Sequence, residues 1–222
     1  MALLPVWTMM SNGFAASSAE FSGFLTSKAQ VMSGASDFTF YDECLLEGLL
    51  SRSWQEWAHF CRSVIVLSCM GADTADGTPI PSHPQALSEQ HVGGAAARAK
   101  ATDKPPTWGK LADTLRKEIM TWGDTDVLAT ILPRMNVPRY PHLLAAFSQA
   151  HESAKAMQTI RNASAHFNAE TMAEVVSLSS KYSAFQITHP TQALFWTVPS
   201  SGDYLFRHAL EDLKENALIA IA

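Results

Sequence analysis

Residues 38–70 read FTFYDECLLEGLLSRSWQEWAHFCRSVIVLSCM and contain the clearest structural pattern in the chain. Most of its apolar residues recur three or four positions apart: Leu46, Leu49, Leu50, Trp54, Trp57, Cys61, Val64 and Ile65. This spacing predicts an amphipathic helix. Asp42 and Glu43 stand near its start, where the helix dipole favours anions, and Gly71 is a suitable end. Because so long a helix is unusual in globular proteins, a break near Gly48–Ser53 stays open as an alternative.

Further helical patterns lie on both sides of this stretch. They cover residues 15–33, 108–122, 124–132, 141–160, 170–182 and 203–218. We expect Pro133 to end the fourth predicted helix, and Asn168 is a suitable N-cap for the helix that starts at residue 170. Only Ala193–Val198, which reads ALFWTV, has the composition of a strand, so at most one short hairpin is expected. The sequence therefore predicts an all-α fold.

The composition changes between residues 71 and 106. GADTADGTPIPSHPQ opens this segment, and HVGGAAARAKATDKPP follows it without a clearer periodic pattern. Because Gly, Pro, Asp and Thr are typical of loops, we predict a long inserted loop here. Such a segment either covers a substrate or is a surface insertion, and both interpretations remain open.

The size and charge of the chain limit its class. With 222 residues it fits a single domain, with a core at about 38–182 and a C-terminal extension at about 183–222. The formal net charge of −5 argues against a surface covered with basic residues, as bulk DNA binding would require, but it does not exclude a local basic groove. Cys61 and Cys69 lie in an apolar helical stretch, so we expect buried free thiols there.

The N-terminus gives no targeting signal. MALLPVWTMMSNGFAASS has no basic region before its apolar residues, so we do not predict a signal peptide. No stretch reaches the roughly 18 uncharged apolar residues needed to span a bilayer. We therefore expect a soluble, cytoplasmic protein that has no membrane partner.

Residues 161–166 contain the side chains best suited to catalysis, and they read Arg161-Asn162-Ala163-Ser164-Ala165-His166. Asn162 and His166 are four positions apart and share one helix face, and the long Arg161 side chain can reach the same cleft. The guanidinium of an arginine grips a phosphate through two parallel donors. An imidazole, with an unperturbed pKa of about 6.5, can take or give a proton near neutral pH.

Cleavage of RNA at its own 2′-hydroxyl needs such groups. A base takes the 2′-hydroxyl proton, a cation stabilises the phosphate, and an acid protonates the departing 5′-oxygen. One His and one Arg are too few for a complete acid–base pair. A dimer that places two such helices across a two-fold axis would supply two of each.

The Arg161-Asn162-x3-His166 pattern at the end of one helix and before another resembles the Arg-polar-x3-His motif of the HEPN superfamily. The resemblance covers about residues 38–70 and 142–182. It implies a helical bundle, usually a homodimer, that cleaves RNA without a metal at a composite site. It also implies a toxin–antitoxin or anti-phage setting, with an antitoxin or another regulatory protein as partner. Asn168 stands where one branch of the family carries a tyrosine that its antitoxin modifies, so that form of regulation is not expected.

We therefore expect a metal-independent endoribonuclease that cleaves single-stranded or loop RNA. His166 would be the general base or acid, Arg161 the phosphate clamp and Asn162 the orienting hydrogen-bond partner. His151 and Glu152, just before the motif, are candidates for a supporting role. The other histidines are scattered without metal-ligand spacing, so no metal and no cofactor are expected.

Two alternatives remain open at this point. The first is a catalytically silent HEPN-like adaptor that assembles a defence or RNA-processing complex, and the acidic charge balance favours it. The second is a helical protein in which the spacing of Arg161 and His166 is accidental. In that case the two side chains would only cap a helix or form surface ion pairs.

Overall fold

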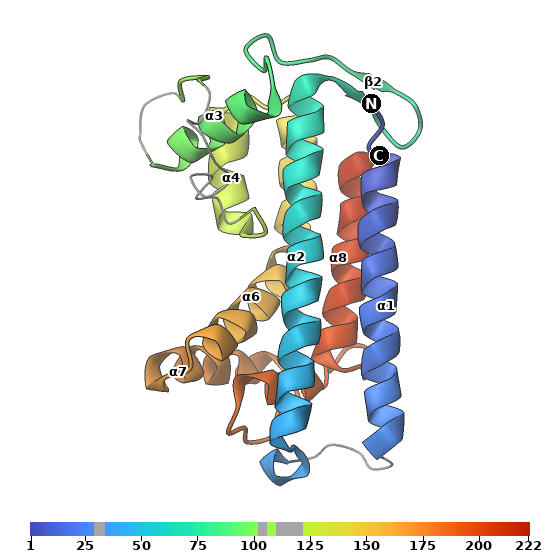
Figure 1. Ribbon diagram of the computed structural model, residues 1–222, viewed down its shortest axis with the longest axis vertical. Coiled ribbons are helices and arrows are strands. Elements are labelled where there is room, and N and C mark those ends of the chain that lie inside the picture. Colours follow the sequence, from blue (N-terminus) through green and yellow to red (C-terminus); the bar gives the residue numbers. More distant parts are fainter. Residues whose placement is uncertain (29–33, 102–105, 110–121) are drawn as a thin grey trace. The chain divides into compact units, whose positions relative to one another are not determined.

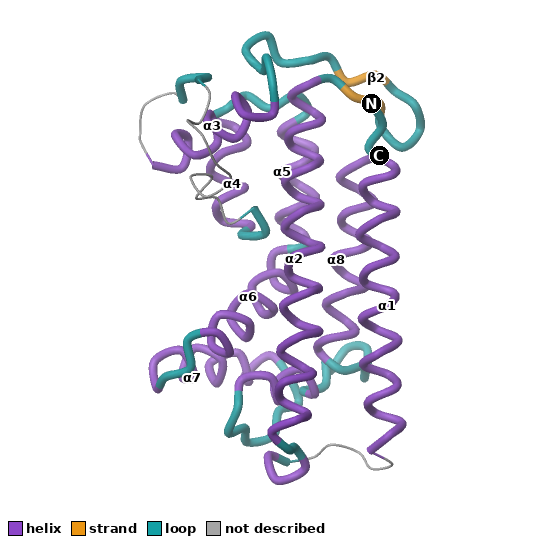
Figure 2. Tube along the Cα trace, in the orientation of Figure 1, coloured by secondary structure: helices purple, strands orange, loops and turns teal. Residues whose placement is uncertain are grey.

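The computed structural model describes residues 1–28, 34–101, 106–109 and 122–222. Most of this part is helical (Figures 1 and 2), which confirms the predicted all-α class. Its α-helices are α1 (Leu4–Lys28), α2 (Phe40–Met70), α3 (Glu89–Ala101), α4 (Thr125–Arg134), α5 (Tyr140–Gln149), α6 (His151–Ala165), α7 (Ala169–Ser177) and α8 (Leu205–Ile221). Shorter elements are the strands β1 (Ala72–Asp73) and β2 (Pro79–Ile80) and the 3₁₀ helices η1 (Ala35–Asp37), η3 (Leu178–Lys181) and η4 (Pro190–Phe195). None of the described helices combines the length and apolar composition needed to cross a membrane.

The chain forms two compact units, and the first contains residues 1–10, 57–151 and 215–222. Its core surrounds Trp57, whose ring centroid lies 5.8 Å from that of Phe60 and 6.0 Å from that of Phe147. The indole Nε1 of Trp57 donates a hydrogen bond to the carbonyl oxygen of Gly123 at 3.0 Å. Within this unit α4 packs against α3 and α5 (Figure 1).

The second unit contains residues 11–56 and 152–214, and it holds the 161–166 motif. Aromatic rings fill its core: the ring centroid of Phe195 lies 4.8 Å from that of Phe21 and 5.0 Å from that of Phe38. Phe195 ends η4, whose six residues are all buried. This packing fixes η4 within the same unit as the first half of α2.

Helix α2 is continuous from Phe40 to Met70, so the alternative of a break near Gly48 is wrong. A Cβ on Gly48 would meet nothing within 4 Å, because this position faces open space, while Leu46, Leu49 and Leu50 beside it are buried. Burial of these leucines keeps the helix intact across an exposed glycine. Gly71, with φ of +89°, ends the helix as expected, because glycine adopts this left-handed conformation without strain.

Helix α1 begins at Leu4, whereas the sequence pattern placed its start at residue 15. The early part of this helix has no charged residue to mark a polar face, so its amphipathic period is weak. Burial of Met10, Phe14, Phe21 and Phe24 still gives it one apolar side. The last predicted residues, 29–33, lie outside the described residues.

The predicted long loop at 71–106 is wrong over much of its length. Residues 72–80 form the β1–β2 pair, with Ala72 opposite Ile80, and residues 89–101 form α3. Val92, Ala95, Ala96 and Ala99 are fully buried on α3 and recur at helical spacing. Because alanine is only weakly hydrophobic, the sequence shows no clear amphipathic pattern at this helix. Residues 102–105 lie outside the described residues.

Four other predicted elements also differ from the structure. Of the strand predicted at Ala193–Val198, residues 193–195 end the 3₁₀ helix that Pro190 opens and His189 caps, and only Thr197 forms isolated antiparallel bridges, with Ser183 and Tyr204. The predicted helix 141–160 is divided at Ala150 into α5 and α6, and 170–182 is shortened to α7 followed by η3. Pro133 lies inside the last turn of α4 rather than after it. The predicted helix 108–122 falls mostly on residues 110–121, outside the described part.

Candidate functional site

Helix α6 positions the motif through its apolar face. Met157, Ile160 and Ala163 on this face are buried, and they hold the last turns of the helix against the core of the second unit. Arg161 and Asn162 lie at the boundary of this face and are half-buried. His166 follows the last helical residue and is exposed. The folding of α6 thus leaves the cation and the amide half-buried near the end of the helix and the imidazole exposed just beyond it.

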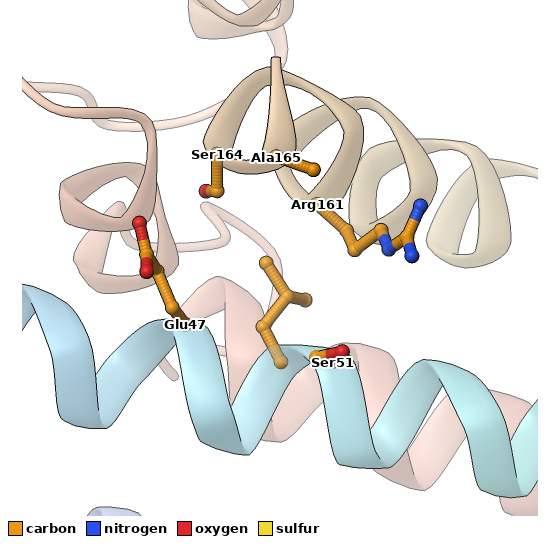
Figure 3. Close-up of a pocket in the computed structure, with 6 residues that line it drawn as sticks. Glu47, Ser51, Arg161, Ser164 and Ala165 are labelled. Carbon is orange, nitrogen blue, oxygen red and sulfur yellow. The ribbon is translucent and has the colours of Figure 1, made fainter. Parts of the chain in front are cut away.

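Arg161 lines a small pocket between α6 and the first half of α2. The pocket has a volume of about 160 Å³ and is lined by Glu47, Leu50, Ser51, Arg161, Ser164 and Ala165. In Figure 3 the Glu47 side chain extends from α2 toward α6 near Ser164, and the Arg161 side chain extends from α6 on the side of Ser51. The pocket is therefore lined by an arginine from one helix and a glutamate from the other, and in this view their charged groups point to opposite sides.

Asn162 contacts Arg161 directly. The guanidinium Nη1 of Arg161 donates a hydrogen bond to the side-chain Oδ1 of Asn162 at 3.3 Å. The orienting role of Asn162 stays a prediction. Of the three predicted site residues, Arg161 lines the pocket, while Asn162 and His166 are not among its described lining residues.

The backbone of His166 is held by hydrogen bonds, whereas its side chain is exposed. Its backbone N–H donates to the carbonyl oxygen of Asn162 at 2.9 Å, which continues the helical bonding by one residue. Its carbonyl oxygen accepts from Thr171 Oγ1 at 2.9 Å and from Asn168 Nδ2 at 3.0 Å. Within the described residues its imidazole makes no hydrogen bond or ion pair. An exposed imidazole of this kind is available for proton transfer.

The predicted N-cap of the next helix is confirmed. Asn168 has extended backbone dihedrals, and its Oδ1 accepts from the backbone N–H groups of Glu170 at 2.9 Å and Thr171 at 3.0 Å. Thr171 Oγ1 accepts in return from the backbone N–H of Asn168 at 3.2 Å. This reciprocal pair starts α7 immediately after the motif.

A second histidine, His189, lies next to the Arg161 pocket, although its position in the sequence did not indicate a role. Nε2 of His189 lies 3.4 Å from Oε1 of Glu47, the carboxylate that lines the Arg161 pocket. The ring of Phe167 lies beside that of His189, with centroids 5.6 Å apart and planes inclined by 33°. His189 and Glu47 are far apart in the sequence, so residue spacing could not predict their contact, which arises only in the folded structure.

His151 and Glu152 take part in other contacts. His151 Nδ1 lies 2.8 Å from Oγ1 of Thr125 in the first unit. Glu152 accepts a hydrogen bond from Lys181 Nζ at 2.8 Å, and both line a different pocket, together with Tyr182 and His208. Burial, and then the charge of Glu152, raise the pKa of the Tyr182 phenol above its ordinary value of 10.0. Neither His151 nor Glu152 lines the Arg161 pocket.

The three cysteines differ in their burial. Cys61 and Cys69 are buried as predicted, whereas Cys44 is exposed. Within the described ranges no group of three or more His, Cys, Asp or Glu side chains is arranged to hold a metal ion. Near α6 the structure therefore brings together Arg161 and Glu47 at one pocket, with His189 in contact with Glu47, while His166 lies exposed at the end of the helix.

Comparison of the chain with protein-family models, with curated proteins and with solved structures finds no match.

Proposed function

We propose that this protein is a metal-independent endoribonuclease of the HEPN type that cleaves single-stranded or loop RNA. The position of Arg161 carries the proposal. Arg161 lines a pocket at the end of α6, and the exposed imidazole of His166 follows five residues later. An arginine at a small pocket and an exposed imidazole supply two of the groups that phosphodiester cleavage requires. The resemblance of residues 161–166 to the HEPN motif supports the same function.

The reaction needs only groups of the protein and of the RNA. The 2′-hydroxyl loses its proton to a base, and its oxygen forms a bond to the adjacent phosphorus. The bond from phosphorus to the 5′-oxygen breaks, and that oxygen takes a proton from His166. Arg161 stabilises the charge on the phosphate, and Asn162 keeps the guanidinium oriented. The products are a 2′,3′-cyclic phosphate, or the 3′-phosphate that follows from it, and a 5′-hydroxyl.

The test is cleavage of a single-stranded RNA in the presence of EDTA, with analysis of both new ends. We expect His166→Ala and Arg161→Ala to lose at least about a hundredfold in rate, as is typical for loss of an acid–base group. The matched controls are His59→Ala and Arg52→Ala, which change exposed residues on α2. An RNA with a 2′-deoxy group at the cleaved position should stay intact. Equal rates in all four variants would refute the function.

We also propose that the enzyme acts as a homodimer and that a regulatory protein, such as an antitoxin, restrains it. A second copy is one source of the second proton-transfer group, because the motif supplies one imidazole per chain. Mixing inactive Arg161→Ala and His166→Ala proteins tests this composite arrangement. Recovery of cleavage in the mixture supports it, and a mixture as inactive as its components contradicts it.

The acidic charge balance favours a second candidate, a HEPN-like adaptor that binds partners without cleaving RNA. A formal net charge of −5 disfavours RNA binding away from a local basic surface. For an adaptor, biological activity would survive both His166→Ala and Arg161→Ala. The same variants therefore distinguish the two functions.

A further inference from the structure

The Arg161 pocket contains a carboxylate that does not neutralise the guanidinium. Glu47 and Arg161 both line it, but within the described residues they form no ion pair with each other. Glu47 instead lies 3.4 Å from His189, through its Oε1 and the ring Nε2. The carboxylate of Glu47 is thus not paired with the guanidinium, and both residues line a pocket that a ligand can enter.

His189 is held in one orientation by the start of η4. Its Nδ1 accepts from the backbone N–H of Thr191 at 3.4 Å and lies 2.8 Å from the Thr191 hydroxyl. A ring nitrogen that accepts a hydrogen bond carries no proton, so this bonding pattern assigns the proton of the neutral ring to Nε2. Nε2 is the atom that faces Glu47. The Nε2–H group of His189 therefore lies on the side of the carboxylate, with Nε2 3.4 Å from Oε1 of Glu47.

The segment that carries His189 is anchored to α2 at a second point. Gln192 Nε2 donates to Oε1 of Glu43 at 3.1 Å, and Glu43 lies one helical turn before Glu47. The His189 side chain is only 17 % exposed, against 41 % for Glu47. The half-buried imidazole is thus held at the start of η4 in a segment anchored to α2, while the carboxylate that it contacts lines the pocket.

We propose that Glu47 is the second proton-transfer group of this site and that His189 positions it. The inference rests on the ribonuclease function proposed above and adds a base to it. Glu47 takes the proton of the 2′-hydroxyl as the 2′-oxygen bonds to phosphorus. His166 gives its proton to the 5′-oxygen as the phosphorus–oxygen bond breaks, and exchange with water restores both groups. Each chain then supplies a base, an acid and a phosphate clamp, and the homodimer proposed above would hold two such sets.

The test compares single-turnover and steady-state cleavage of a single-stranded RNA in EDTA. We expect Glu47→Gln to lower kcat by at least about a hundredfold with little change in KM, because a base acts in the transition state. His189→Ala should lower kcat by up to about a hundredfold, since a misplaced catalytic group loses that much. His189→Gln should recover most of this loss, because its side-chain amide can donate to Glu47. Glu170→Gln on α7 and His59→Gln on α2 are matched exposed controls and should behave as wild type.

The outcomes separate this inference from the function on which it rests. If His166→Ala is inactive but Glu47→Gln and His189→Ala cleave at the control rate, the role of Glu47 is refuted and the ribonuclease stands. If His189→Gln is as slow as His189→Ala, the donor role of His189 is refuted. If wild-type protein does not cleave RNA, both proposals fail. Should Glu47→Gln not fold, as judged by circular dichroism, Glu47→Asp replaces it, and an undiminished rate then refutes the proposal.

Discussion

The side-chain amide of Asn168 donates from Nδ2 to the carbonyl oxygen of His166 at 3.0 Å. The Oδ1 atom of the same side chain accepts from two backbone N–H groups at the start of α7. One residue therefore begins a helix and also restrains the backbone that carries the candidate catalytic imidazole. The two ends of this amide can be tested separately, because a carboxylate keeps the acceptor and loses the donor.

Asn168→Ala should lower the free energy of unfolding by about 1 kcal/mol, which is typical for loss of an N-cap. Asn168→Asp should keep that stability, because its carboxylate can still accept from Glu170 and Thr171 at a helix N-terminus. Urea unfolding measures both effects. Hydrogen exchange at the His166 and Thr171 amides should increase in Asn168→Ala. An alanine variant as stable as wild type would contradict the cap.

The indole of Trp57 contributes a buried hydrogen bond as well as apolar volume. Trp57→Phe removes the donor and leaves the Gly123 carbonyl without this partner, so we expect a loss of about 1–3 kcal/mol in the free energy of unfolding. Trp54→Phe is the matched control, since Trp54 is also buried on α2 but makes no side-chain hydrogen bond with any described residue. Urea unfolding of the two variants should show the larger loss at Trp57. Equal losses would show that volume alone matters.

The carboxylate of Asp42 predicts an acid dependence of stability. Burial alone would raise its pKa, but hydrogen bonds from Lys28 and from the backbone and hydroxyl of Thr39 lower it, so the pKa lies below its ordinary value of 3.8. Because the pKa is lower in the folded state, this stabilisation is complete above about pH 4 and is lost as pH falls through the folded value.

Replacing this carboxylate by a neutral amide tests that dependence. Asp42→Asn should destabilise the protein by about 2 kcal/mol at pH 7, the size of a hydrogen bond to a charged group, and by less at pH 2.5. Urea unfolding at both pH values measures the difference. Lys28→Met keeps the carboxylate but removes one of its partners, so its stability should begin to fall at a higher pH than that of wild type. A penalty for Asp42→Asn that is the same at both pH values would contradict the depressed pKa.

The three thiols should differ in reactivity. Burial raises the pKa of Cys69 to about 12 and raises that of Cys61 well above its ordinary value of 9.0. Since the thiolate is the nucleophile, an alkylating reagent at pH 8 should modify the exposed Cys44 and leave Cys61 and Cys69 unmodified in the folded protein. Mass spectrometry of the labelled peptides measures this order. Unfolding in urea should expose all three, and rapid native labelling of Cys61 would show that its helix opens.

Elements with strong local patterns were predictable from the sequence. The helix through Trp54 and Trp57 follows from apolar spacing, and the start of α7 follows from Asn168, whose capping contacts are all within three residues. Helix α3 could not be recognised, because Gly93, Gly94 and the alanines around them are small residues that pack closely without a strong apolar pattern. At Ala193–Phe195 the strand-like composition reflects burial, and Pro190 opens a 3₁₀ helix there.

Some residues of the candidate site could also be predicted from the sequence, and others could not. Arg161, Asn162 and His166 are neighbours in the sequence, so their types and spacing could be read directly, although their catalytic roles stay predictions. Glu47 and His189 come together only through the packing of η4 against α2. A sequence pattern cannot show such a contact between distant positions, because it depends on the complete core around Phe195.

The contact between Gln192 and Glu43 joins positions 149 residues apart, and that between His189 and Glu47 lies beside it. A ribosome releases the chain from its N-terminus, so α2 and the whole of α6 emerge before the segment that carries these two partners. Until residue 189 emerges, the Glu47 carboxylate consequently has no imidazole in contact with it. A chain whose translation stops before residue 189 can therefore never form the contact that lies beside the Arg161 pocket.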